Sequence, residues 1–269
     1  MELLKKLEEL YPDSSKTTLR KWIAQGRVLP DGSLLPRKKY AKCGVEILYE
    51  DKEIVVIEKP AGLLSVATPA DKRSVHDILK QRYFKTQVFP VHRLDKETSG
   101  VLVFAYTPRA RDALKEQFEK HDIEREYEAI VAGELSQKNG TWKSNLFEGK
   151  NFYVMSGRQG KLAVTHYQTV LSNERLTLIR VRLETGRKNQ IRVQASDAGH
   201  PVLGDQKYGY RGPKLKRLYL HARKLGFNHP ITKKALEFHS SLSIGEEFKR
   251  LDKIMVNEGA EQPSQNWSK

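Results

Sequence analysis

Residues 92–106 read His-Arg-Leu-Asp-Lys-Glu-Thr-Ser-Gly-Val-Leu-Val-Phe-Ala-Tyr, a charged loop followed directly by an apolar run. The unbroken apolar run from Val101 to Tyr106 is typical of a strand buried within a sheet. A loop that ends at such a strand is held by a rigid element, and binding and catalytic side chains are often found on loops of this kind. We therefore place the centre of the fold here, with Asp95 as the first candidate for chemistry.

Strand patterns dominate the chain on both sides of this stretch. Runs rich in β-branched and aromatic residues occupy 45–49, 53–57, 127–131, 163–171 and 176–183. Helices are expected over 108–120, opened by a proline, and over 188–198. Many strands with few interposed helices predict an α+β fold built on a large mixed, mostly antiparallel sheet.

A separate block precedes the first strand. Leucines recur at helical spacing over residues 3–10, and a second short helix is expected over 16–25. A turn at 30–32 and a basic run at 37–39 indicate a small hairpin after it. The stretch from Ser15 to Val28 resembles the small helical-hairpin RNA-binding domain named after ribosomal protein S-four. The alternative is an ordinary solvated helical hairpin.

The charge of the chain points to a polyanionic partner. Lys and Arg number 48 against 33 Asp and Glu, which gives a formal net charge of +15. Nucleic acid is the commonest partner of such a positive field, although a basic and inert surface is the alternative. No apolar run is long enough to span a membrane, the N-terminal stretch is not a signal peptide, and the single cysteine, Cys43, cannot form an internal disulfide. We therefore expect a cytoplasmic protein.

Asp95 lies between two cationic residues, Arg93 and Lys96. Nearby positive charge favours the ionised carboxylate, which is the form that a nucleophile or a base requires. An aspartate in a charged loop is also a common turn former or surface ion-pair partner, and the residues alone leave that alternative open.

Five segments, taken in chain order, resemble the motifs of the RluA-type pseudouridine synthases, which act on ribosomal and transfer RNA. The loop at 92–100 resembles the catalytic motif of that family. The other matching segments are 58–66, 125–131, 185–209 and 220–230. The resemblance implies an RNA-binding domain at 1–44 and a pseudouridine synthase catalytic domain at 45–248. From their amphipathic and then polar pattern, residues 249–269 are expected to form a C-terminal helix with a disordered tail.

The resemblance also implies catalytic roles for three residues. Asp95 would be the catalytic carboxylate, attacking C1′ or C6 or removing the 2′ proton. Arg192 would pair with Asp95 and keep it ionised, and such a charge-assisted pair can be bidentate. Tyr127 would stack on the target base. From the residues alone, Arg192 could equally be a surface arginine on an amphipathic helix and Tyr127 a core tyrosine.

Substrate contacts are implied for three more residues. Arg93 would fill the space that the flipped uridine leaves, or would only anchor a phosphate. Leu220 would pack on the uracil or be a buried strand leucine. Lys59 would contact a phosphate or belong to the scaffold. Isomerisation is redox-neutral, and the sequence carries no closely spaced Cys/His cluster and no nucleotide-binding motif, so no metal and no cofactor are expected.

Two positions depart from the family pattern, which more often has histidine where Asn189 and Gln194 stand. We expect these changes to alter the hydrogen bonds beside Arg192. The leading hypothesis is a monomeric enzyme that isomerises uridines in structured RNA, with large-subunit ribosomal RNA first and transfer RNA second. The alternatives are a catalytically silent RNA-binding protein and a glycosidase-like enzyme, for which Asp205 could supply a second acid.

Overall fold

The computed structural model describes residues 2–12, 15–24, 39–40, 45–83 and 85–257. Its helices are α1 (Glu2–Leu10), α2 (Lys16–Ala24), α3 (Val75–Arg82), α4 (Pro108–Glu119), α5 (Gln190–Asp197) and α6 (Phe248–Asn257), with short 3-10 turns η1 (Lys150–Phe152), η2 (Gln206–Tyr208) and η3 (Ile244–Glu247). Its strands are β1 (Lys39–Tyr40), β2 (Glu46–Glu50), β3 (Ile54–Lys59), β4 (Phe89–Pro90), β5 (Ser99–Ala105), β6 (Glu124–Ala132), β7 (Asn139–Glu148), β8 (Val154–Ser156), β9 (Lys161–Ser172), β10 (Leu176–Leu183), β11 (Leu220–Asn228) and β12 (Ala235–His239).

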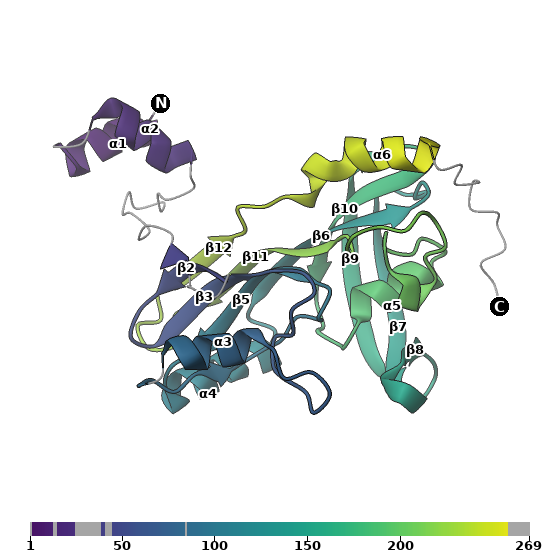
Figure 1. Ribbon diagram of the computed structural model, residues 1–269, viewed down its shortest axis with the longest axis horizontal. Helices are drawn as coiled ribbons and strands as arrows, with labels where there is room; N and C mark the ends of the chain where they lie inside the picture. Colours follow the sequence, from purple (N-terminus) through teal and green to yellow (C-terminus); the bar gives the residue numbers. More distant parts are fainter. Residues whose placement is uncertain (1, 13–14, 25–38, 41–44, 84, 258–269) are drawn as a thin grey trace.

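The strands of the described residues form one large sheet in the order β1-β2-β3-β5-β11-β6-β10-β9-β7-β8 (Figure 1). β4 pairs with β5, and β12 pairs with β11. The pairing of β11 with β5 is parallel and the other strand pairs are antiparallel. The predicted α+β fold with a large mixed, mostly antiparallel sheet is therefore confirmed.

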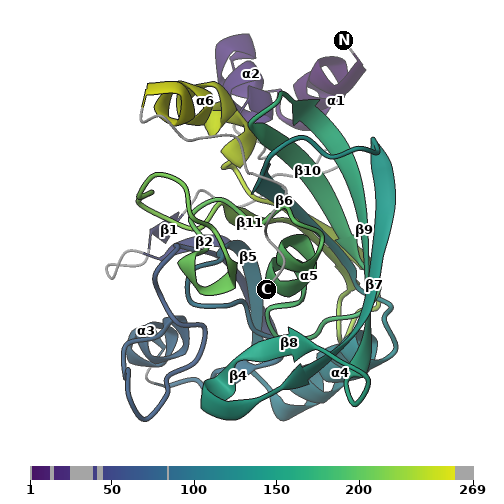
Figure 2. The same cartoon turned by 90° about the vertical axis from the view of Figure 1, so that its right-hand side faces the viewer.

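Successive side chains of a strand point to opposite faces of the sheet. In the central strands both faces are buried, because helices pack on each of them. In β3, Val55 and Ile57 belong to the cluster around α3, whereas Ile54 and Val56 belong to the cluster around α4. The same division recurs farther along the sheet, where α5 covers the face of β6 that carries Ala129. α6 covers the opposite face of β6. Figure 2 shows α5 in the concave side of the curved sheet.

Close approach of β5 to β11 depends on Gly100. Its backbone has φ +118°, and a Cβ atom built there would lie 2.2 Å from the carbonyl oxygen of Ala222. A side chain at this position would therefore collide with the neighbouring strand. The glycine brings the loop before β5 beside the start of β11, and β6 is the next strand in the order.

The N-terminal helices agree with the expected helical spacing. α1 and α2 pack against each other and bury Leu7 and Leu19 completely. The expected hairpin turn at 30–32 and the tail beyond residue 257 lie outside the described residues, so the boundaries at 44 and 248 remain predictions. In the described part of the chain, no helix combines the length and the apolar character needed to cross a membrane.

Candidate active site

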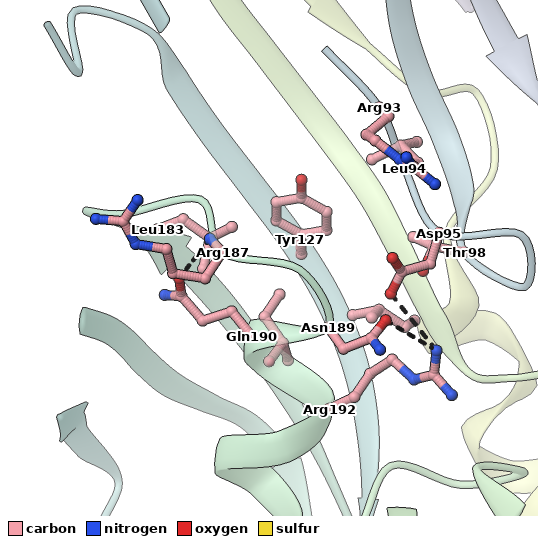
Figure 3. Close-up of a pocket in the computed structure, with 12 residues that line it drawn as sticks. Arg93, Leu94, Asp95, Thr98, Tyr127, Leu183, Arg187, Asn189, Gln190 and Arg192 are labelled. Atoms are coloured by element: carbon pink, nitrogen blue, oxygen red, sulfur yellow. Dashed lines mark hydrogen bonds and ion pairs between the residues drawn. The ribbon is translucent and has the colours of Figure 1, made fainter. Parts of the chain in front are cut away.

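A pocket opens where the loop before β5 meets β6, the start of β11 and the N-terminal end of α5 (Figure 3). Five of the six predicted site residues line it: Asp95, Arg93, Tyr127, Arg192 and Leu220. Strand pairing explains part of this gathering, because Leu220 lies opposite Ala129 and Ala222 lies opposite Tyr127 in neighbouring strands. The other lining residues are Leu94, Thr98, Leu183, Arg187, Asn189, Gln190 and Ile191.

The sixth residue, Lys59, lies beneath the loop and outside the pocket. Its side chain is fully buried, and Nζ donates to the carbonyl oxygens of Pro60 (2.9 Å), Leu63 (2.6 Å) and Lys96 (3.0 Å). Burial lowers the pKa of Lys59 to about 8, against the opposing effect of Glu97. A buried ammonium with three carbonyl acceptors has no donor left for a phosphate. The scaffold alternative therefore fits Lys59, and the expected substrate contact does not.

Ser65 gives the loop a second attachment. Its hydroxyl donates to the carbonyl oxygen of Leu94 at 2.8 Å and accepts from the Leu94 N–H at 3.0 Å. The carbonyl of Asp95 accepts from the N–H of Thr98 at 3.1 Å, which closes a turn. These bonds fix the backbone on both sides of the Asp95 side chain.

Arg192 makes its shortest hydrogen bonds with Asp205. Nε and Nη2 donate to the two Asp205 oxygens at 2.6 and 2.7 Å, while Nη1 lies 3.5 Å from Oδ2 of Asp95. The expected pairing with Asp95 is present, but the bidentate partner is Asp205. Burial disfavours the charged guanidinium, yet the hydrogen bonds and charge of Asp205 raise the pKa of Arg192 overall. Arg192 therefore stays protonated beside Asp95.

The ion pair between Arg192 and Asp205 argues against Asp205 as a second catalytic acid. Its side chain is 1% exposed, and Arg192 occupies both carboxylate oxygens. A general acid must reach the substrate with a proton, and this carboxylate is buried behind Arg192. The glycosidase-like alternative loses its proposed second group.

Asn189 forms the closest side-chain contact with Asp95. The amide atom that faces Asp95 lies 2.6 Å from Oδ2 and 3.1 Å from Oδ1 of the carboxylate, and the other amide atom lies 2.8 Å from the Tyr208 hydroxyl. An amide oxygen cannot hydrogen-bond a carboxylate oxygen, so the nitrogen faces Asp95 and the oxygen accepts from Tyr208. This orientation gives up a 3.3 Å contact with Arg192 and gains two bonds to Asp95. Figure 3 shows the Asn189 and Asp95 side chains pointing toward one another.

Gln194, the second departure from the family pattern, lies away from the pocket. Its amide oxygen accepts from Thr165 at 2.6 Å, and its nitrogen donates to Ser144 at 3.0 Å and to the carbonyl oxygen of Ala163 at 3.1 Å. It joins α5 to β7 and β9. Of the two positions, only Asn189 changes the surroundings of Asp95.

The remaining pocket residues combine apolar and cationic character. Tyr127 is half-buried, and burial raises its pKa, so the phenol keeps its proton. Leu220 is 3% exposed and belongs both to the apolar cluster under α5 and to the pocket wall, which fits both of its expected roles. Arg93 is exposed at the pocket. Lys96 pairs with Asp71 at 2.9 Å, so the expectation that it acts on Asp95 is not supported.

Asn189, Asp205 and Tyr208 complete the site. The sequence predicted altered hydrogen bonds at Asn189 and a candidate second acid at Asp205, but not the contacts that these residues make with Asp95 and Arg192. Membership of the 185–209 motif was the available signal, but the hydrogen bonds between them depend on tertiary contacts. Among the described residues, no group of three or more His, Cys, Asp or Glu side chains could hold a metal ion. The arrangement offers a carboxylate held by an amide and a guanidinium, beside an aromatic ring and an aliphatic wall.

Comparisons with known proteins agree with one another. The sequence model of the RNA pseudouridylate synthase family matches residues 53–197. Ribosomal large subunit pseudouridine synthase D of Vibrio cholerae is 34% identical over 275 residues, which cover 86% of this chain and 85% of the relative. The RNA pseudouridine synthase YhcT of Bacillus subtilis is 39% identical over 201 residues, 70% of this chain and 65% of the relative. The solved structure of human RNA pseudouridylate synthase domain containing 4 is similar with a TM-score of 0.64 and 27% identity, covering 77% of this chain and 92% of that chain.

Proposed function

This chain belongs to the RNA pseudouridylate synthase family and is an isomerase that converts uridine in RNA to pseudouridine, and we propose that it acts on large-subunit ribosomal RNA with Asp95 as its catalytic carboxylate. The observation that carries the role of Asp95 is its position. It is the carboxylate that lines the pocket, and Asn189 and Arg192 contact it. Relatives named for the ribosomal large subunit in Vibrio cholerae and Pasteurella multocida support the choice of RNA.

The reaction needs a carboxylate that is ionised and fixed in position. Isomerisation breaks the bond between N1 and C1′, turns the uracil, joins C5 to C1′ and expels the C5 hydrogen as a proton. The Asn189 amide and the Arg192 guanidinium both donate toward Asp95, which holds its carboxylate in position. Asp95 then attacks C1′ or C6, or takes the 2′ proton.

The apolar part of the pocket suits the uracil base of a flipped uridine. A uridine in structured RNA must leave its stack to reach Asp95, at a cost of about a few kcal/mol that is smallest in loops. Tyr127 offers a ring face and Leu220 an aliphatic surface to the flipped base. Arg93 is exposed at the same pocket, and no described side chain forms an ion pair with it, so its guanidinium is available to fill the gap in the RNA or to bind a phosphate.

The test is release of tritium from RNA labelled at C5 of uridine, because joining C5 to the sugar expels that hydrogen. We expect release from ribosomal RNA by the wild type and its loss in Asp95→Asn. Asp112→Asn is the matched control, since it removes an exposed carboxylate on α4. Faster release from transfer RNA would replace the proposed substrate by the second candidate. Tight RNA binding without release from either RNA would contradict the proposal and favour a silent RNA-binding protein.

A further inference from the structure

One aromatic side chain near the pocket is exposed to an unusual degree. Phe152 is 75% exposed, more than any other large hydrophobic residue in the described ranges. Its backbone has φ +58°, and that of Asn151 has φ +59°. Asparagine tolerates this left-handed region, but a bulky residue there is a genuine outlier. Outliers of this kind persist where the surroundings impose them, and they are often associated with function.

The turn that presents Phe152 is attached to η2, whose Tyr208 contacts Asn189 of the pocket. The Tyr153 hydroxyl donates to the carbonyl oxygen of Lys207 at 2.9 Å, and the Tyr153 and Tyr208 rings lie 4.9 Å apart. The N–H of Val154 donates to the Tyr208 hydroxyl, which also bonds Asn189 of the pocket. The exposed ring is therefore held in a defined position relative to Asp95.

Lys188 lies beside this ring, and Lys207 lies beside the backbone of the same residue. Lys188 Nζ lies 5.4 Å from the ring centroid of Phe152, and the Nζ atoms of Lys188 and Lys207 each lie 3.5 Å from its carbonyl oxygen. Lys188 also pairs with Glu148 at 2.6 Å, so part of its charge is compensated. Lys207 forms no ion pair with any acid in the described ranges. Lys188 directly precedes Asn189 in the chain, which places these charges beside the pocket.

We propose that Phe152, Lys188 and Lys207, here called the Phe152 platform, bind a nucleotide that flanks the target uridine. When the target leaves the stack, the neighbouring base loses a stacking partner and has a free face. An exposed aromatic ring can receive that face, and the lysines can bind the adjoining phosphate. One exposed ring with lysines beside it is too small an apolar surface for a protein partner but suits an RNA strand. The inference rests on the proposed function.

The experiment measures RNA binding and turnover separately. The probe is a fluorescently labelled RNA hairpin whose loop contains the target uridine, with Kd from anisotropy and kcat and KM from tritium release. Phe152→Ala should raise Kd and KM about 5- to 150-fold, the range for loss of one base–aromatic stack. It should leave kcat within about twofold. Phe152→Trp should restore binding, because stacking needs a ring and not a particular residue.

Four comparisons distinguish a binding role from a structural one. Leu242→Ala removes another exposed apolar side chain, 54% exposed, and should leave Kd unchanged. Phe152→Gly suits the left-handed backbone, so the melting temperature should stay equal or rise while RNA binding weakens. Lys207→Ala should reduce the slope of log Kd against log salt by about one, whereas Phe152→Ala should leave that slope unchanged. A hairpin with an abasic site beside the target should bind wild type and Phe152→Ala equally.

Two results would overturn the inference. The first is a Kd of Phe152→Ala within twofold of the wild-type Kd, measured on an RNA that the enzyme converts. This result would leave the proposed function intact, because the RNA is still isomerised. The second is weaker binding accompanied by a lower melting temperature in Phe152→Gly, because the ring would then be structural. If no RNA released tritium, the proposed function would fail. The Kd comparison would still decide whether Phe152 contacts RNA.

Discussion

The bidentate contact between Arg192 and Asp205 makes Asp205→Asn an informative perturbation. Asparagine keeps the size of the side chain and one oxygen, which can accept from Nε or Nη2 of Arg192. Its NH₂ group faces the other guanidinium N–H, so one charge-assisted hydrogen bond becomes a contact between two donors. The guanidinium, whose side chain is 10% exposed, keeps only Asp95 as a nearby counter-ion, at 3.5 Å.

The loss of stability can be estimated from this geometry. Removing one partner of a buried ion pair costs about 3–5 kcal/mol, and the remaining contact with Asp95 favours the lower end. About 3 kcal/mol corresponds to a fall in melting temperature of about 6–12 °C for a chain of this size. Arg192 would also turn toward Asp95 and displace it. A displacement of about 1 Å in a catalytic group lowers kcat by about 10- to 100-fold.

Calorimetry and tritium release test the two parts of this prediction. Asp112→Asn is the control for loss of an exposed carboxylate and should change neither quantity. Arg192→Gln and the double variant close a thermodynamic cycle, in which we expect a coupling of about 2 kcal/mol or more because both single changes break the same pair. The expected fall in melting temperature is at least about 6 °C. A melting temperature within about 2 °C of wild type, together with an unchanged kcat, would refute the reasoning.

Three further perturbations have defined outcomes. Asn189→Asp places a carboxylate where an amide donates to Asp95 at 2.6 Å, so kcat in the tritium assay should fall about tenfold further than in Asn189→Ala. Burial lowers the pKa of His221 to about 4. The unfolded chain therefore takes up a proton first, and between about pH 6.5 and 4 this histidine should contribute about 3 kcal/mol to the loss of stability measured by urea unfolding. His221→Gln should remove that contribution, while the buried His92, whose pKa is lowered to about 3, keeps its own. Gly100→Ala would press a Cβ against Ala222 and should lower unfolding free energy by more than about 3 kcal/mol.

Each of these changes has a matched control within the chain. Gly62 also has a positive φ, +80°, but a Cβ there would meet nothing within 4 Å, so Gly62→Ala should cost only about 1 kcal/mol. His239 is exposed, so His239→Gln should leave the acid-induced loss of stability in place. Equal destabilisation by the two alanine substitutions would contradict the role assigned to the close approach of β5 and β11. Equal kcat values for Asn189→Ala and Asn189→Asp would contradict the assigned orientation of the amide.

Local sequence patterns were sufficient for much of the fold. The strands at 53–57 and 101–106, the proline-opened helix α4 and the helix beside Arg192 all lie close to their expected positions. Continuous apolar runs and helix-start signals are properties of neighbouring residues, so they can be recognised without knowing the fold. Several elements were missed, α3, β7, β8 and β12 among them. α3 is short, and Ser74 caps its start. β7 is mostly polar and half-exposed, so its apolar pattern is weak.

The partners of the charged groups were decided by tertiary structure. The sequence places Lys96 beside Asp95, but the folded loop pairs it with Asp71, 25 residues away. Arg192 meets Asp95 across 97 residues and binds Asp205 more closely.

The sequence by itself determined the α+β class and the basic charge, because these depend on composition and local pattern, and its motifs named the candidate site residues. The structure decided which carboxylate faces the pocket, which one is buried, and where Phe152 points. Such pairings depend on strand register, burial and backbone dihedrals, which exist only once distant segments have packed together.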